Sequence, residues 1–155
     1  MIKGVETKEL KVNADERGWL IEIMRSDWEL FEKFGQVYIT TSYPKVVKAW
    51  HMHKLQTDNM TCISGKVKFV LYDDREGSNT KGQIMEIEMD GKNPVLIKIP
   101  AGVWHGFKNI GNELVIVINA PTELYNYENP DEYRLPPDTK KIPYDWGLDP
   151  NVKHG

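Results

Sequence analysis

Short segments rich in β-branched and aromatic residues, separated by glycine turns, fill the middle of this 155-residue sequence. Within residues 84–89, apolar and polar side chains alternate, which is typical of a strand with one buried face. A single helix is predicted at residues 28–34, with Ser26 or Asp27 available as its N-cap. The predicted strands cover residues 36–42, 46–53, 66–72, 84–89, 95–99 and 114–119. Short strands with almost no helix predict an all-β antiparallel sandwich or barrel.

The composition fits a soluble globular protein, with 40% hydrophobic and 28% charged residues. A formal net charge of −3 without a basic stripe argues against nucleic acid as a partner. Cys62 is the only cysteine, so no intrachain disulfide can form, and a reducing compartment is expected. The N-terminus has no apolar signal segment, and the longest aliphatic run, residues 114–118, is too short to span a membrane. We therefore expect a cytoplasmic protein without a membrane partner.

The length is typical of one globular unit, so a single domain is expected over residues 1–155. It would contain an N-terminal strand segment (residues 1–25), a barrel (residues 34–119) and a C-terminal strap (residues 120–155). The strap is rich in proline and tyrosine, and side chains such as Tyr144 and Trp146 are costly to leave in water. We therefore expect the strap to be ordered over the barrel.

Three of the four histidines fall in two short segments of the predicted barrel. His51 and His53 are two residues apart, so a strand would turn both toward the same face. His105 lies in the second segment, which runs from Pro100 to Asn109. Imidazoles transfer protons near neutral pH and are the commonest metal ligands. The pattern therefore predicts a chemical site inside the barrel, and its alternative is a set of packed, hydrogen-bonded histidines.

The two histidine segments resemble the two conserved motifs of the cupins. In the first, the His51-x-His53 pair is followed by an acid at Asp58, where cupins normally have a glutamate. The second matches P-x-G-x-x-H-x-x-x-N at every fixed position. This resemblance implies a cupin fold, that is, a double-stranded β-helix or jelly-roll barrel. It also implies one possible metal site, for a divalent transition metal held by His51, His53, Asp58 and His105.

A second resemblance covers most of the chain. Residues 15–22 resemble the D-x-R-G-x-F-x-E opening of the dTDP-4-dehydrorhamnose 3,5-epimerase family. Further matches, in the family's order, lie at residues 34–36, 72–80, 99–107, 122–125 and 142–146. The chain is identified as a divergent member of this family of nucleotide-sugar cupins. The resemblance implies an isomerase without a cofactor, a dTDP-4-keto-6-deoxy sugar as substrate, and a homodimer that exchanges its N-terminal strands.

In this family a base removes a proton beside the ketone, and an acid returns a proton on the other face of the sugar. The catalytic residues that the resemblance implies are His51 as the base, Asp138 as the carboxylate that orients it, His105 and Asn119. The substrate-binding residues that it implies are Arg17, Glu22, Gln36, Lys48, His53, Asp58 and Tyr125.

The chain departs from the family at several of these positions. Lys48 replaces an arginine that meets the diphosphate, and His53 replaces a glutamine. Asp58 replaces the lysine that stabilises the enolate, and a carboxylate there opposes an enolate unless a cation or metal is paired with it. Asn119 replaces the tyrosine acid, for which the candidate substitutes are Tyr125, Tyr127 and Tyr133.

These departures keep three alternatives open. The first is a nucleotide-sugar ketoisomerase of the same fold, which begins with the same proton abstraction. The second is a metal-dependent cupin enzyme that uses the histidine and aspartate set named above. The third is a non-catalytic protein that binds sugar nucleotides, because a site can bind a ligand without its proton donors.

Overall fold

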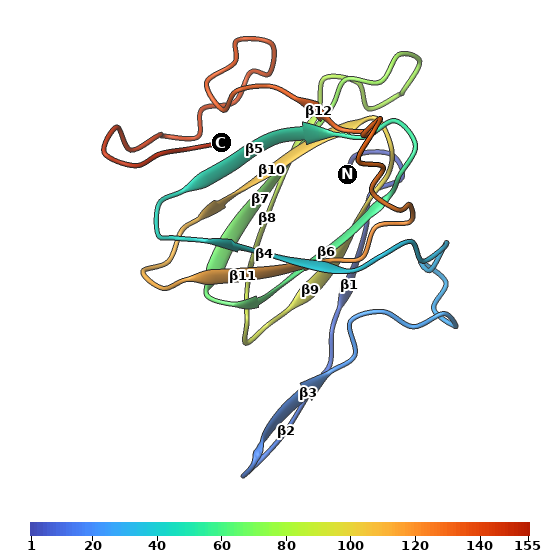
Figure 1. Ribbon diagram of the computed structural model, residues 1–155, viewed down its shortest axis with the longest axis vertical. Helices are drawn as coiled ribbons and strands as arrows, with labels where there is room; N and C mark the ends of the chain where they lie inside the picture. Colours follow the sequence, from blue (N-terminus) through green and yellow to red (C-terminus); the bar gives the residue numbers. More distant parts are fainter.

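The computed structural model describes residues 1–155 and contains twelve β-strands and no α-helix (Figure 1). The first sheet runs in the order β1 (Glu6–Glu9), β9 (Val95–Ile99), β6 (Asp58–Ser64), β11 (Val115–Asn119) and β4 (Tyr38–Ser42). The second runs in the order β12 (Tyr133–Arg134), β5 (Val47–Met52), β10 (Val103–Asn109), β7 (Lys66–Asp73) and β8 (Ile84–Asp90). The two antiparallel sheets face each other as a jelly-roll barrel, which confirms the predicted all-β fold. No helix in the structure has the length and apolar character needed to cross a membrane.

The predicted helix at residues 28–34 is wrong. This segment makes a turn, in which the Phe31 amide donates to the Trp28 carbonyl at 2.9 Å. Its apolar side chains are explained by tertiary packing instead, because Leu30 and Trp28 pack with Leu10 and Leu96 on the outside of the first sheet. A seven-residue helix is too short to be stable by itself. Tertiary packing therefore decided the conformation here.

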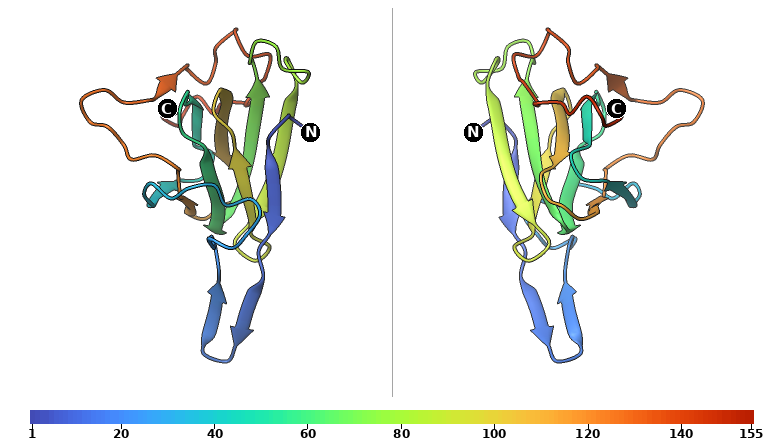
Figure 2. Two further views of the ribbon diagram at one scale, coloured as in Figure 1. Left: turned by 90° about the vertical axis from the view of Figure 1, so that its right-hand side faces the viewer. Right: turned by 90° about the vertical axis from the view of Figure 1, so that its left-hand side faces the viewer.

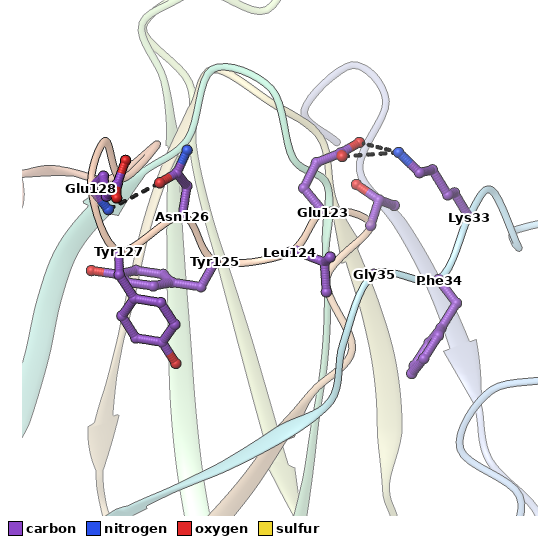
Figure 3. A pocket seen from close by; sticks show the side chains of 10 residues that line it. Lys33, Phe34, Gly35, Glu123, Leu124, Tyr125, Asn126, Tyr127 and Glu128 are labelled. Carbon is purple, nitrogen blue, oxygen red and sulfur yellow. Dashed lines mark hydrogen bonds and ion pairs between the residues drawn. The ribbon is translucent and has the colours of Figure 1, made fainter.

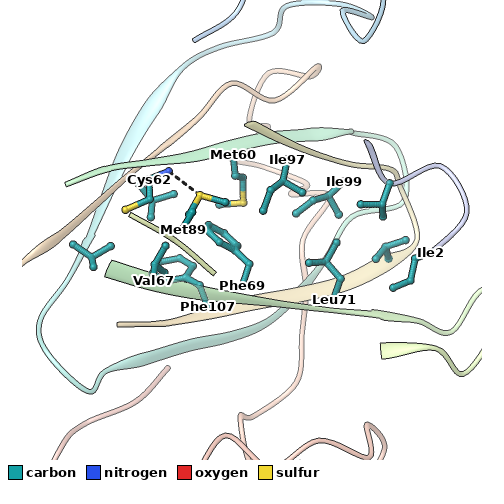
Figure 4. Close-up of a cluster of buried hydrophobic side chains, with 14 residues drawn as sticks. Ile2, Met60, Cys62, Val67, Phe69, Leu71, Met89, Ile97, Ile99 and Phe107 are labelled. Carbon is teal, nitrogen blue, oxygen red and sulfur yellow. Dashed lines mark hydrogen bonds between the residues drawn. The ribbon is translucent and has the colours of Figure 1, made fainter. Parts of the chain in front are cut away.

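Apolar side chains from both sheets fill part of the barrel interior (Figure 4). The rings of Phe69 and Phe107 lie 5.4 Å apart, and the buried Cys62 packs in the same cluster. Met60 and Phe107 belong to this cluster and also line the polar cavity described below. The apolar core therefore forms one wall of that cavity and holds its strands in place.

The C-terminal tail packs on the outer face of the second sheet. Trp146 is 4% exposed, and its ring lies 5.0 Å from that of Trp50 on β5. Ile142 belongs to the same buried cluster, and Tyr144 packs against it. Tyr127, by contrast, is 89% exposed. The later half of the tail is thus held by its aromatic residues, while the loop around Tyr127 stands at the surface.

A hairpin of β2 (Val12–Asp15) and β3 (Gly18–Ile21) forms a small sheet of its own. It projects from one end of the barrel, beyond the two main sheets (Figures 1 and 2). Trp19 and Leu20 on this hairpin are 57% and 60% exposed. The hairpin therefore presents apolar side chains that its own barrel does not cover.

Candidate functional site

A polar cavity of about 540 Å³ lies between the two sheets. Strands β4, β6 and β11 of the first sheet and β5 and β10 of the second contribute side chains to it. Residues that follow β11 complete its rim. Its lining comprises Gln36, Tyr38, Thr40, Lys48, His51, His53, Gln56, Asp58, Met60, His105, Gly106, Phe107, Asn119, Tyr125, Tyr127, Glu132 and Arg134.

An irregularity between β5 and β10 brings the cavity's basic side chains together. His105 pairs with His51 and Phe107 pairs with Lys48, so β5 carries one extra residue between these two pairs. Such a bulge shifts the alternation of the strand, which lets both Lys48 and His51 line the cavity although they are three residues apart. Gly106 lies at this point, where any Cβ would collide with Ala49. The glycine is therefore required by the close approach of the two strands.

His51 has a carboxylate partner. Its Nδ1 lies 3.4 Å from Oε1 of Glu132, which Arg134 also contacts at 2.8 Å. The two-residue strand β12 pairs Arg134 with His51 and so fixes the place of Glu132. Burial and the neighbouring His105 lower the pKa of His51 to about 4, although Glu132 opposes this shift. The ring is therefore neutral near pH 7, and a neutral imidazole can accept a proton.

Asp58 is the most deeply buried acid of the cavity, at 1% exposure. Its Oδ1 accepts hydrogen bonds from Gln56 Nε2 at 2.9 Å and from Asn119 Nδ2 at 2.8 Å. Its Oδ2 lies 3.4 Å from His53 Nε2 and 3.2 Å from His105 Nε2. Burial by itself raises the pKa of Asp58, but His105, His53 and Asn119 hold that pKa below its usual value. Asp58 is therefore a carboxylate.

Backbone carbonyl groups determine which ring nitrogen of His53 and of His105 carries the hydrogen. His105 Nδ1 lies 3.1 Å from the Val103 carbonyl oxygen, and His53 Nδ1 contacts the Asp131 carbonyl oxygen. Because a carbonyl oxygen only accepts, each Nδ1 must carry the hydrogen. Both Nε2 atoms then point toward the Asp58 carboxylate. The three donor atoms lie within 4.8 Å of one another, a set that can hold protons or a metal ion.

A tyrosine hydroxyl faces the same amide that orients Asp58. Tyr38 and Asn119 are register partners on β4 and β11, and Asn119 Nδ2 donates to the Tyr38 hydroxyl at 2.9 Å. Burial, followed by the charge of Asp58, raises the pKa of Tyr38 to about 12. The hydroxyl therefore keeps its proton. Sequence reasoning missed Tyr38, although it lies two residues after Gln36, and alternation would have turned both toward the cavity.

Cationic groups also reach the cavity. Lys48 Nζ donates to Thr40 Oγ1 at 3.1 Å, and burial lowers the pKa of Lys48. Arg134 lies at the rim with its side chain 68% exposed. These two groups give the cavity positive charge without blocking the base.

Two tyrosines of the rim also belong to an open surface groove (Figure 3). The rings of Tyr125 and Tyr127 lie 5.0 Å apart with their planes at 69°. Phe34 lies on the other side of the groove, and Lys33 there forms an ion pair with Glu123 at 2.8 Å. The rim thus offers exposed aromatic surfaces next to the polar cavity.

The structure brings together most of the residues that the sequence predicted for the site. Those that line the cavity are His51, His105, Asn119, Gln36, Lys48, His53, Asp58 and Tyr125. Three lie elsewhere on the chain. Arg17 pairs with Asp15 on the hairpin, with its side chain 82% exposed, and Glu22 pairs with Arg25 at 2.6 Å. Asp138 is exposed in the loop after β12, and Glu132 occupies the place beside His51 that was predicted for Asp138.

The register of the tail explains why Glu132, and not Asp138, lies beside His51 in this structure. Three acids, Asp131, Glu132 and Asp138, lie within the same tail segment, so the sequence pattern does not distinguish them. The pairing of β12 with β5 does so, because it places Glu132 one residue before a two-residue strand that faces His51. Asp131 instead accepts from the Lys54 and Leu55 amides at 2.9 Å and 2.7 Å.

Two proteins of glycan synthesis are similar to this chain over almost their whole length. The probable low-salt glycan biosynthesis epimerase Agl13 of Haloferax volcanii is 46% identical over 150 residues, which cover 96% of each chain. The spore coat polysaccharide biosynthesis protein SpsL of Bacillus subtilis is 41% identical over 149 residues, which cover 96% of this chain and 99% of SpsL.

Solved structures show the same architecture. A dTDP sugar isomerase from Desulfovibrio desulfuricans superposes with a TM-score of 0.89 at 31% identity, over 94% of this chain and 92% of its own. The RmlC epimerase of Legionella pneumophila, in complex with dTDP-4-keto-L-rhamnose, superposes with a TM-score of 0.83 at 25% identity, over 97% and 82%. A profile of the dTDP-4-dehydrorhamnose 3,5-epimerases matches residues 1–154. The chain therefore belongs to the dTDP-4-dehydrorhamnose 3,5-epimerase family.

Proposed function

We propose that this chain is an epimerase of a nucleotide-linked 4-keto-6-deoxy sugar and serves the synthesis of a deoxysugar-containing glycan or polysaccharide. Its family and the two relatives in glycan and spore coat synthesis support this proposal. One observation carries it furthest. The same cavity holds His51 beside the Glu132 carboxylate and the protonated hydroxyl of Tyr38.

The proposed reaction begins at His51. The 4-keto group acidifies the neighbouring C–H bond, because the electron pair left behind spreads onto the ketone oxygen as an enolate. His51 Nε2 takes the proton, and Glu132 stabilises the imidazolium that forms. The enolate carbon then takes a proton from the hydroxyl of Tyr38, in place of the family tyrosine that Asn119 replaces. Proton removal and return leave the oxidation level unchanged, so this reaction needs no redox cofactor.

The rest of the cavity suits the nucleotide. Lys48 and Arg134 would bind the diphosphate, and the rim tyrosines Tyr125 and Tyr127 would stack against the base. The Legionella structure, which holds a dTDP-linked keto sugar at 25% identity, supports this class of ligand. A cytoplasmic location is part of the proposal, and the buried free thiol of Cys62 agrees with a reducing compartment.

A homodimer is also part of the proposal. The β2–β3 hairpin extends beyond its own barrel with Trp19 and Leu20 exposed, as expected for an arm that packs on a second copy. Arg17 and Glu22 would then meet the substrate of the partner subunit rather than that of their own chain. Light scattering should give twice the mass of the 17.9 kDa chain, and Leu20→Asp should lower it. A monomer at micromolar concentration would overturn the dimer.

The reaction is tested by NMR in D₂O with dTDP-4-keto-6-deoxyglucose. We expect solvent deuterium to enter at C3, C5 or both, and we expect His51→Ala to lose the exchange. A ketone that moves to C3 would identify the ketoisomerase alternative. Binding of the nucleotide without any exchange would identify the non-catalytic binding protein and overturn the proposed epimerase.

A further inference from the structure

Arg134 and His51 compete for one oxygen atom of Glu132. Arg134 Nη2 donates to Glu132 Oε1 at 2.8 Å, whereas His51 Nδ1 lies 3.4 Å from the same oxygen. A hydrogen bond from a nitrogen to an oxygen is normally about 2.7–3.2 Å long. In this structure the oxygen is therefore bonded to the guanidinium, and the carboxylate has not closed on the imidazole.

We propose that the diphosphate of the substrate draws Arg134 away from Glu132, so that this carboxylate closes on His51. Arg134 is then a positioning residue that couples binding of the nucleotide to proton transfer at the sugar. The inference rests on the proposed function, because it takes His51 as the base and a sugar linked to a diphosphate as the substrate.

The backbone that carries Arg134 is fixed, while its side chain is free to move. Arg134 pairs with His51 across β12 and β5, and the next residue, Leu135, exchanges two backbone hydrogen bonds with Trp50 at 2.8 Å and 3.1 Å. The Arg134 side chain is 68% exposed, and its guanidinium makes a single hydrogen bond, the one to Glu132. An exposed ion pair contributes little to stability, so the guanidinium can change its partner at small cost.

The guanidinium lies where an anion would meet it. Glu132 and Arg134 are two residues apart, so both side chains turn toward the cavity, which both residues line. A guanidinium binds phosphate through two parallel hydrogen bonds, and a diphosphate offers more charge and more acceptor atoms than one carboxylate. A diphosphate in the cavity therefore competes with Glu132 for Arg134.

The second cation of the cavity does not take part in this competition. Lys48 Nζ donates to Thr40 Oγ1 at 3.1 Å and makes no ion pair with Glu132. Lys48 can therefore attract the same diphosphate without changing the carboxylate beside His51. This difference makes Lys48 a matched control for Arg134.

Release of Arg134 changes what Glu132 can do. Its Oε1 then faces His51 alone, and the negative diphosphate balances the charge of Arg134. Both effects favour the imidazolium that forms when His51 takes the proton of the sugar, because a carboxylate and an imidazolium attract each other. A keto sugar without a diphosphate would meet a base whose carboxylate is still bonded elsewhere, so the protein would favour nucleotide-linked sugars in the chemical step as well as in binding.

The test divides the substrate into two pieces. The methyl glycoside of 4-keto-6-deoxyglucose keeps the ketone but lacks the diphosphate, which inorganic pyrophosphate supplies separately. We expect saturating pyrophosphate to accelerate the entry of solvent deuterium into the glycoside about tenfold, within the usual range of coupling between two sites. An unchanged or slower rate would overturn the coupling.

Two variants assign the effect to one cation. Arg134→Met should exchange the glycoside faster than wild type without pyrophosphate and should gain nothing when it is added. With the dTDP-linked substrate, its loss should appear in KM rather than in kcat. Lys48→Met should need more pyrophosphate but keep the acceleration at saturation. Exchange of the glycoside that is slower in Arg134→Met than in wild type would show that Arg134 holds Glu132 in place, and would overturn the inference.

Crystal structures without ligand and with dTDP test the movement independently of the reaction. We expect Arg134 to contact a phosphate oxygen in the complex, and His51 Nδ1 to lie within about 3.0 Å of Glu132 Oε1. An Arg134–Glu132 pair that is unchanged in the complex would overturn the inference, as would a failure of dTDP to bind. Absence of exchange with dTDP-4-keto-6-deoxyglucose itself would overturn the proposed function, whereas these structures would still decide where Arg134 goes.

Discussion

Asn119 donates a hydrogen bond to the hydroxyl of Tyr38 at 2.9 Å, across the pair of strands β4 and β11. In the proposed reaction, Tyr38 on the neighbouring strand acts in place of the family tyrosine that Asn119 replaces. The hydroxyl lines the same cavity as His51 and keeps its proton, because burial and the nearby Asp58 raise the pKa of Tyr38 to about 12. A protonated hydroxyl thus lies next to Asn119, and the proposed reaction uses it as the acid.

Tyr38→Phe tests this substitution. We expect formation of the epimer to fall about 100-fold, as is usual when a general acid is removed. Solvent deuterium should still enter with retention of configuration, because His51 can remove a proton and return it on the same face. NMR of the product in D₂O measures both quantities. Tyr125→Phe at the rim is the control and should keep epimer formation. If Tyr125→Phe lost epimer formation while Tyr38→Phe kept it, the acid would be Tyr125 instead of Tyr38.

Glu132→Gln tests the carboxylate beside His51. We expect kcat to fall at least tenfold, because a neutral amide stabilises the imidazolium less than a carboxylate does. Asp138→Asn makes the same chemical change at the exposed acid after β12 and should leave kcat within twofold of wild type. Steady-state kinetics of the two variants decide whether Glu132 or Asp138 is the carboxylate that orients His51. A large loss in Asp138→Asn with none in Glu132→Gln would contradict the geometry of the site.

Local patterns predicted an all-β sandwich or barrel and the clustered histidines, and the resemblance to cupins selected the barrel, but neither identified the partners of the histidines. Alternation and glycine turns predict six of the twelve strands but miss β6 and β10, which carry Asp58 and His105. The H-x-H spacing predicts that His51 and His53 line one cavity, as they do. Glu132 could not be chosen from the sequence, because its position depends on a two-residue strand paired to a segment far away in the chain. The helix prediction for residues 28–34 was wrong for a similar reason, since Leu30 is buried through contacts with Leu10 and Leu96, which lie far away in the sequence.

Gly106→Ala tests the close approach of β5 and β10. A Cβ at this position would collide with Ala49, so the strands must separate at the bulge that positions His51. We expect the free energy of unfolding to fall by about 2 kcal/mol, a value typical of overpacked positions. Chemical denaturation measures this loss. Adding Ala49→Gly to the Gly106→Ala chain removes the colliding methyl and should restore part of the lost free energy of unfolding. If Ala49→Gly restores none of it, the strain lies elsewhere.

The buried carboxylate of Asp73 predicts how stability depends on pH. Arg75 Nε donates to it at 2.8 Å, and the hydroxyls of Ser78 and Thr80 donate at 2.7 Å and 2.6 Å. The Arg75 guanidinium, with smaller contributions from the hydroxyls, holds the pKa of Asp73 well below its usual value. Because the folded state lowers this pKa, the stabilisation is complete above the ordinary value of about 3.9 and is lost progressively at lower pH. We expect Asp73→Asn to lower the free energy of unfolding by about 2 kcal/mol at pH 7, where it weakens charge-assisted hydrogen bonds. Urea denaturation at pH 7 and at pH 3 should show a smaller difference between variant and wild type at the lower pH, and a difference that grows on acidification would contradict the assignment.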